Sequence, residues 1–275
     1  TKGLHTRSKE LASAQGLYDG IESEVSYLRA NLLGWAKHFF LLAFVLVAAS
    51  WLWPNKWFVR VALALTAACT LLVAIGITWR CVLRGRPPVT TLYETVIFIT
   101  GSMAAAGLIV EWLTRQKIAL ALSPLLGAAG LFLGERYELE KMEDTMPQLV
   151  AVLDTNFWLA THVTCIAIGY MASLFTGFVA HVYVLGKVVG FKKNDPGYYR
   201  SVTRMVYGLL AFALIFSTIG TILGGIWANE SWGRFWGWDP KENGALMIVL
   251  WSLAMVHLRL GGYIKAFGMA QMAII

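Results

Sequence analysis

The sequence predicts an all-α fold, a polytopic transmembrane helix bundle with about seven spans and a truncated eighth. Of its 275 residues, 57% are hydrophobic and 14% are charged, whereas a soluble domain carries about 25% charged residues. A chain of this length cannot hide so much apolar surface in a water-soluble core. Apolar runs of about 20 residues, the length that crosses a bilayer, follow one another along most of the chain. Tryptophans lie near the ends of these runs, as expected of an interfacial aromatic belt.

The first 35 residues differ in character from the rest of the chain. They carry mixed charge, with apolar side chains at roughly helical spacing, which predicts an amphipathic arm on the outer surface of the membrane. The remaining domain, residues 36–275, contains the membrane spans. We expect these spans at residues 36–53, 57–79, 92–113, 118–134, 158–186, 204–226 and 243–263. The truncated eighth should begin near Phe267 and be cut off at Ile275, so we interpret the chain as part of a longer protein.

The net charge of +7 does not indicate a nucleic-acid partner, because many basic residues lie in short gaps between apolar runs. Most of them fall in alternate gaps, which predicts that this side is cytoplasmic. The acidic segment 135–157 and the gap after the sixth span then lie outside. Arg80, Arg84 and Arg86 disagree, since they would lie outside as well. Either these arginines are a functional exception, which we favour, or the predicted number of spans is wrong by one.

A tryptophan-rich loop, residues 227–242, separates the last two complete spans. Its rings alternate with glycines, which let the backbone approach a ligand closely, and flat aromatic faces offer stacking area. An interfacial belt would not require the glycines, so the composition favours a broad, planar, apolar ligand over lipid. The candidate ligand-binding residues are Trp227, Trp232, Gly233, Phe235, Trp236, Gly237, Trp238 and Asp239.

Three stretches of the chain resemble known proteins of cytochrome c biogenesis. The loop sequence WGRFWGWDPKE resembles the WWD haem-handling motif of the CcsA/ResC, CcmC and CcmF families. Residues 85–95, GRPPVTTLYET, and residues 153–172, LDTNFWLATHVTCIAIGYMA, are similar to the CcsA/ResC family in particular. The pattern departs from that family after Glu242, where Asn243 and Gly244 replace a Thr-Trp pair.

The resemblance implies a function, a cofactor and partners. A CcsA/ResC protein exports haem b and, as a holocytochrome c synthase (haem lyase), attaches it through thioethers to the CxxCH segment of apocytochrome c on the outer face. Its expected partners are a CcsB (ResB) subunit or fused portion, apocytochrome c and membrane lipid. The expected location is a bacterial inner or thylakoid membrane, with the loop facing the outer side. Two alternatives stay open: a CcmC-like module that delivers haem without ligating it, and a structural or ion-conducting subunit with a tryptophan belt.

Two histidines are the candidate axial ligands of haem iron, which takes imidazole in an apolar pocket. His162 lies about a turn inside the outer end of its span, where an ionisable residue is costly and therefore a functional candidate. The resemblance implies that it ligates the outer haem; the alternative is a structural histidine bonded to a neighbouring helix. His257 lies about 22 Å deeper. The resemblance places it at a second haem position within the membrane, and the alternative is a polar or interfacial contact.

Haem propionates are anionic and need cationic partners. Arg84 and Arg86 are candidates for that contact, which would also explain their exception to the charge rule, although a solvated loop explains them equally well. Each haem position then has one axial histidine in this sequence. The resemblance implies that the other ligands come from a further span and from CcsB.

Overall fold

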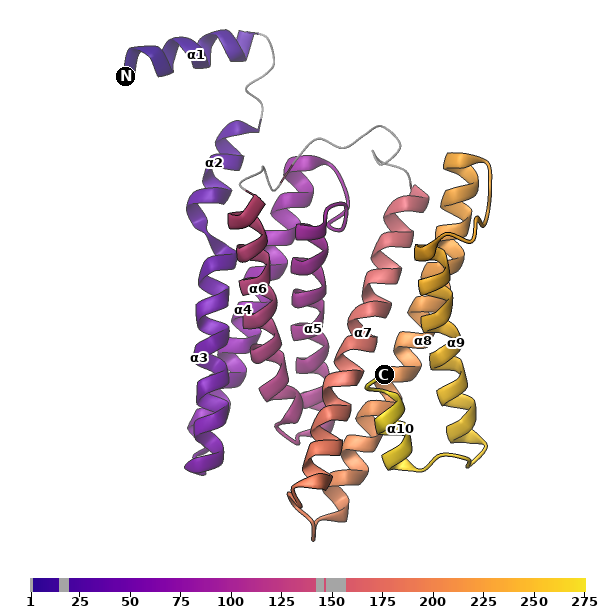
Figure 1. The fold of residues 1–275 in the computed structure, drawn as a ribbon. Coiled ribbons are helices and arrows are strands. Elements are labelled where there is room, and N and C mark those ends of the chain that lie inside the picture. The colour runs from indigo at the N-terminus through magenta and orange to yellow at the C-terminus, as the bar shows by residue number, and fades with distance from the viewer. Residues whose placement is uncertain (1, 15–19, 142–145, 147–156) are drawn as a thin grey trace.

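The computed structural model describes residues 2–14, 20–141, 146 and 157–275, and these residues form helices and connecting turns without a strand (Figure 1). The acidic segment expected outside, and the start of the stretch 153–172, fall partly outside the described residues. The helices are α1 (Lys2–Ala14), α2 (Ile21–Ala30), α3 (Leu32–Leu52), α4 (Lys56–Arg84), α5 (Leu92–Thr114), α6 (Ile118–Lys141), α7 (Phe157–Val188), α8 (Pro196–Trp232), α9 (Pro240–Leu260) and α10 (Ala266–Met272).

The predicted polytopic helix bundle is confirmed. Within the described residues, seven helical segments are long and apolar enough to cross a membrane, and they coincide with the seven predicted spans. The residues expected to open an eighth span form the short helix α10. α8 is longer than predicted at both ends, because Asp195 caps it ahead of Pro196 and it ends only at Gly233, whose φ is +71°.

The predicted arm consists of two helices. α2 leads into α3 through Asn31, whose φ is +44°, and the two helices form nearly one rod, whereas α1 turns away from it (Figure 1). α2 also contacts α4, since the Trp79 indole donates to the Ser23 hydroxyl at 2.9 Å and Tyr27 packs edge-on against Trp79. The second half of the arm therefore extends the bundle.

The spans alternate in direction, so the connections gather at two ends (Figure 1). The α4–α5 and α8–α9 connections lie at one end, which we call the top as drawn in Figure 1. The short connections after α3, α5, α7 and α9 lie at the other end, the base. The connections that we predicted on one side of the membrane thus lie at the top, and those predicted on the other side lie at the base. Residues 85–91 lie at the same end as residues 233–239.

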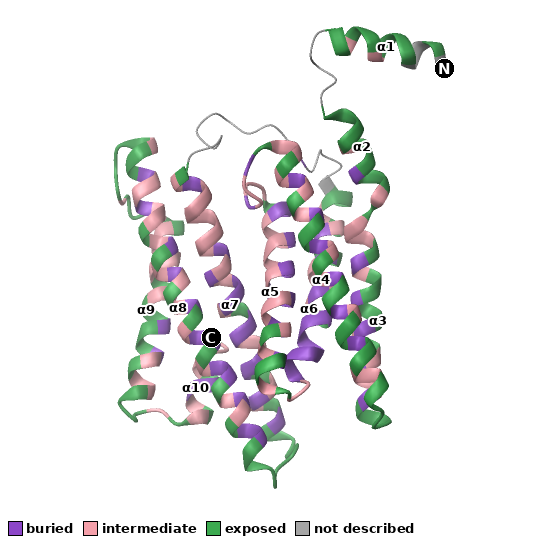
Figure 2. Ribbon diagram, turned by 180° about the vertical axis from the view of Figure 1, so that it is seen from behind, coloured by how far each residue is buried: buried purple, intermediate pink, exposed green. Residues whose placement is uncertain are grey.

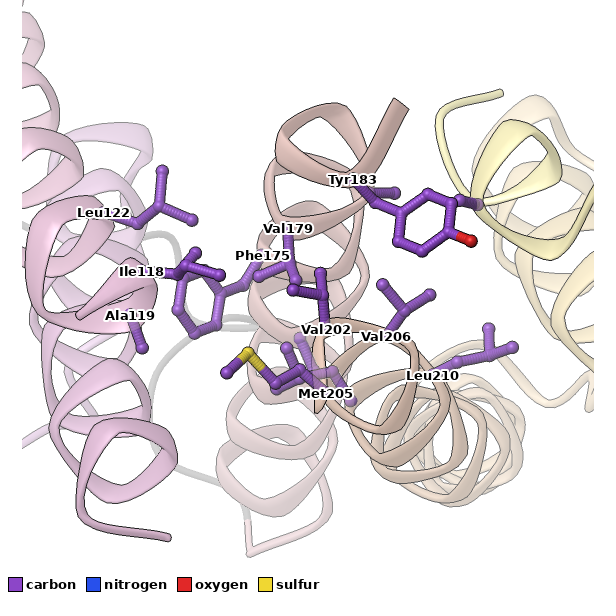
Figure 3. Close-up of a cluster of buried hydrophobic side chains, with 14 of the residues drawn as sticks. Ile118, Ala119, Leu122, Phe175, Val179, Tyr183, Val202, Met205, Val206 and Leu210 are labelled. Atoms are coloured by element: carbon purple, nitrogen blue, oxygen red, sulfur yellow. The ribbon is translucent and has the colours of Figure 1, made fainter. Parts of the chain in front are cut away.

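α7 and α8 have the most extensive contact of any two helices in the described part of the chain. Phe175, Val179, Val202 and Val206 lie in a large buried cluster between these helices and the start of α6 (Figure 3). Nearer the top, small residues replace large ones: a Cβ atom on Gly220 would lie 2.8 Å from the Ile166 Cα atom. Small residues let membrane helices approach closely, and here they bring the α8 backbone against α7 one turn beyond His162.

Large apolar side chains are exposed along the outside of the helices, while the buried residues face the bundle interior (Figure 2). Leu41, Val45, Ile109 and Ile215 are each more than half exposed. A soluble protein rarely exposes so much contiguous apolar surface. This outer surface therefore suits hydrocarbon.

Candidate functional site

His162 is fixed by the neighbouring helix. It lies in the second turn of α7, near the top, and its Nδ1 atom is 2.7 Å from the Gly220 carbonyl oxygen of α8. A carbonyl oxygen can only accept, so Nδ1 must carry the hydrogen. In the neutral imidazole, Nε2 then holds the free lone pair, which is the form in which histidine binds a metal while a backbone acceptor orients it.

Trp227 lies beside this imidazole on the last turns of α8. The His162 and Trp227 rings are nearly parallel, 6° apart, with centroids separated by 6.3 Å. Trp232 packs edge-on against Trp227 at 4.8 Å. The Trp227 indole Nε1 is buried and has no hydrogen-bond partner among the described residues. A polar donor without a partner, next to an imidazole whose Nε2 is free, fits a site made for an additional group.

Two glycines of α8 make room for the aromatic side chains. A Cβ atom on Gly224 would lie 2.6 Å from Cε1 of His162, and one on Gly225 would lie 2.6 Å from Cζ of Phe235. No side chain fits at either position without moving a ring. Gly224 therefore lets the His162 imidazole pack against α8, and Gly225 does the same for the Phe235 ring at the next position of the helix.

The loop between α8 and α9 is held by the start of α9. The Asp239 carboxylate caps the helix by accepting from the amides of Lys241 and Glu242 at 2.8 and 2.9 Å. The Glu242 carboxylate returns to the loop and accepts from the amides of Gly237 and Asp239 at 2.7 and 3.3 Å. This reciprocal capping box fixes the backbone on which the rings stand, including Trp238 at a φ of +60°.

The loop rings remain accessible despite this fixed backbone. Trp232, Phe235 and Trp238 are 52%, 50% and 69% exposed. Arg234 lies over the Trp232 ring at 5.9 Å and 3.6 Å from the Glu242 carboxylate. The end of α8 and the loop therefore offer exposed aromatic faces and a cation, which suits a flat apolar ligand with anionic substituents.

The second candidate ligand, His257, lies far from this group. It is seventeen residues after Pro240 on α9, about 26 Å along the helix, and so near the base. Its ring is exposed and bonded through Nδ1 to the Leu253 carbonyl one turn back. The structure thus places His162, Trp227 and Trp232 in one group, with Phe235 packed against the adjacent Gly225, and keeps His257 apart from them.

Arg84 and Arg86, the predicted propionate contacts, are engaged within the protein. Arg86 is buried and lies 3.3 Å from the Glu94 carboxylate, and Arg84 lies 3.7 Å from Glu24 of α2. Arg80 also pairs with Glu94, at 3.5 Å. These arginines join the α4–α5 loop to the bundle, and their contact with propionate stays a prediction.

Sequence reasoning missed several parts of the top and the base. Glu242 holds the loop and Glu94 pairs with two buried arginines, yet neither was singled out; Thr91 followed three residues later by Glu94 was a capping signal. His181 on α7 lines an apolar cavity of about 800 Å³ between α7, α9 and α10. His257 is not in the lining of that cavity.

In the described residues, seven apolar spans with an aromatic loop held at one end define a polytopic integral membrane protein. The model of the cytochrome c assembly protein family matches residues 89–274. The chain therefore belongs to the cytochrome c assembly protein family, and it acts in cytochrome c maturation.

Individual relatives agree with the family. The chain is similar to protein NrfI of Wolinella succinogenes, with 32% identity over 190 residues, which are 68% of this chain and 20% of NrfI. It is 28% identical to the cytochrome c biogenesis protein CcsA of Prochlorococcus marinus, over 80% of this chain and 79% of that protein. CcsA of Chlorella vulgaris is also 28% identical, over 72% of each. The chain thus spans about a fifth of NrfI but most of CcsA.

Among solved structures, the chain resembles cytochrome c haem lyase CcmF. The TM-score is 0.60 at 18% identity, and the match covers 88% of this chain and 44% of CcmF. At this identity the likeness concerns the fold. It supports the arrangement of the spans independently of the sequence relatives.

Proposed function

We propose that the protein exports haem b across the membrane and attaches it to apocytochrome c on the outer face, as a holocytochrome c synthase. The observation that carries the proposal is the His162 imidazole, oriented by the Gly220 carbonyl so that Nε2 is free, beside the aromatic loop. Membership of a cytochrome c assembly family supports haem as the substrate.

Different residues at the top hold different parts of the haem. His162 binds the iron on one side, and a second histidine from a further span or a partner subunit binds the other. Trp232, Trp236 and Trp238 line the macrocycle, and because the Trp236 and Trp238 rings are 83° apart, only one of these two can lie face-on against it. Gly233 and Gly237 keep the loop backbone close to the macrocycle. Arg234, Arg84 and Arg86 are the candidate partners of the propionates, and Arg234 is the one that stands in the loop itself.

The ligation step is an addition that needs no oxidant. Each cysteine thiol of the CxxCH segment adds across a haem vinyl group, so that a carbon–sulfur bond forms at the inner vinyl carbon and the thiol hydrogen moves to the terminal carbon. No leaving group is released. Holding vinyl groups and thiols in register can lower the barrier by about 7–11 kcal/mol, so the contribution of the protein is orientation by His162 and the loop.

His257 serves an earlier position on the route. Its exposed ring near the base supplies one axial ligand, and a CcsB subunit or fused portion is the proposed source of the second. The membrane is a bacterial inner membrane or a thylakoid membrane, with the loop on the outer side. The basic connections at the base support this orientation.

Imidazole rescue tests the ligand assignment. The protein is purified in detergent with co-purifying haem, and its Soret absorption is measured for native protein and for His162→Gly, with and without added imidazole. We expect the Soret band to fall strongly in the variant and to return with imidazole. His38→Gly, which removes a histidine bonded within its own helix, is the control and should keep its haem. An unchanged Soret band in His162→Gly would refute the assignment.

A second experiment separates ligation from simple delivery. The full protein is co-expressed with CcsB and an apocytochrome in cells that lack other maturation genes, and covalent haem is stained after denaturing electrophoresis. Covalent haem in the cytochrome supports the synthase. Haem bound to the protein without covalent product would instead indicate a haem-delivery module.

A further inference from the structure

A cavity at the base of the bundle lies far from the aromatic loop. Its volume is about 360 Å³, and it lies where the start of α8 meets the lower parts of α7, α9 and α10. The residues that line it are Tyr183, Tyr199, Arg200, Thr203, Arg204, Arg259 and Ala266. Three of the seven are arginines, and none is acidic.

The arginine charges of this cavity are not balanced by nearby carboxylates. Arg200 and Arg204 are one turn apart on α8, a spacing at which like charges repel. Arg259 reaches the cavity from α9 and donates to the Ile264 carbonyl at 3.1 Å. None of the three forms an ion pair with a carboxylate in the described part of the chain. An anion between them would relieve the repulsion and accept their hydrogen bonds.

Tyrosines form the inner wall of the cavity. Tyr183 and Tyr199 are both buried and meet edge to face, with centroids 5.3 Å apart. Lys187 lies over the Tyr199 ring at 3.9 Å, which adds another positive charge nearby. The Tyr183 hydroxyl points toward the ribbon of the C-terminal helices (Figure 3). The cavity therefore has a buried tyrosine wall, and Arg200 and Arg204 stand at its exposed rim.

The surroundings indicate an amphiphilic occupant. Leu260, Tyr263 and Phe267, which flank Arg259 and Ala266 in the chain, are 71%, 83% and 40% exposed. Apolar surface thus continues outward from a cationic cavity at the level where the spans end. A phosphate with an acyl chain satisfies both surfaces, whereas a free phosphate would use only the arginines.

We propose that this cavity binds the phosphate headgroup of an anionic phospholipid. Basic pockets between membrane helices recognise such headgroups. The site is separate from the haem function at the top of the bundle. A bound lipid would neutralise the charge between α8 and α9 and hold the base of these two helices together.

Lipid retention tests the proposal. The full chain is purified after incubation in mixed vesicles of phosphatidylglycerol and phosphatidylcholine, and both lipids retained per protein are measured by mass spectrometry. The variant carries Arg200→Gln, Arg204→Gln and Arg259→Gln. The matched control carries Lys56→Gln, Arg60→Gln and Lys193→Gln, which removes the same charge from the base outside the cavity.

We expect the cavity variant to bind phosphatidylglycerol at least about tenfold more weakly, since each basic residue near a membrane surface contributes roughly fivefold. The control and a triple Arg→Lys variant should keep most of the lipid, because both keep the positive charge of the cavity. Equal retention in native and cavity-variant proteins would overturn the proposal. So would equal loss in the control, or displacement of the lipid by millimolar inorganic phosphate, which would identify free phosphate as the ligand.

Discussion

The hydrogen-bond partner of each histidine separates His162 from the other histidines whose side chains the structure describes. His38, His181 and His257 each bond through Nδ1 to a carbonyl one turn back in their own helix. Such a bond lies within one helix, so it does not depend on how that helix packs against its neighbours. His162 instead uses the Gly220 carbonyl of another helix, so its orientation depends on how α7 and α8 pack.

Gly224→Ala tests this dependence with the smallest possible change. The new Cβ atom would lie 2.6 Å from Cε1 of His162, so the ring must move away from its bonded position. We expect haem retention after purification to fall about tenfold, which corresponds to roughly 1.4 kcal/mol of binding free energy. The Soret absorption per protein measures this loss.

Gly208→Ala is the matched control for that change. It adds a methyl group to the same helix where no atom lies within 4 Å, and alanine favours helix over glycine. Its haem content should equal that of the native protein. If Gly224→Ala also retained its haem in full, the position of the His162 ring would not matter for the site.

At the scale of the element, the start of α9 determines the shape of the aromatic loop. The acidic residues of the sequence WDPKE serve as an N-cap and as a clamp: Asp239 satisfies amides of the first turn, and Glu242 satisfies amides of the loop. Without these bonds, the consecutive rings and glycines of the loop would have many conformations of similar energy. The capping box therefore prepares the loop before any ligand binds.

Removing the clamp should loosen the loop without unfolding α9. In Glu242→Ala the Gly237 and Asp239 amides lose their acceptor, a change of about 1 kcal/mol for a capping interaction. We expect faster amide hydrogen exchange at residues 233–239 and weaker haem retention, while exchange in the middle of α9 stays unchanged. Glu230→Ala, an exposed position of α8, is the control and should leave both quantities as they are. Unchanged exchange in the loop of Glu242→Ala would show that other contacts hold it.

The fold of the whole molecule could be predicted because bilayer thickness imposes a length on every span. Long apolar runs in the sequence therefore matched the seven helices that could cross a membrane. Helix ends outside the hydrocarbon are not constrained in this way, and α8 accordingly extends six residues beyond its predicted end to Trp232. Trp227 and Trp232 consequently stand on a helix, although they were expected in a loop.

The candidate site was predictable in its composition but not in its geometry. Rings, glycines and His162 could be recognised because their chemistry is unusual at a membrane boundary. The bond from His162 to Gly220 joins residues 58 positions apart, and it follows from the close packing of α7 and α8, which no local pattern encodes. The ion pair of Arg86 with Glu94 likewise could not be predicted, because it depends on the folded conformation of the α4–α5 loop.

The alternating directions of the spans lead to a prediction for the molecule in its membrane. Glu230 near the top and Lys193 at the base are both exposed, and the span α8 between them requires that they face opposite sides of the bilayer.

Single cysteines are introduced as Glu230→Cys and Lys193→Cys after Cys69, Cys81 and Cys165 have been replaced by alanine. A membrane-impermeant maleimide is then added to intact cells or sealed vesicles. We expect it to label the Glu230 position from the outer side, and the Lys193 position only after the membrane is opened, because the basic connections lie at the base. Labelling of both positions from one side would mean that α8 does not cross the bilayer, and would remove the proposed outer location of the haem site.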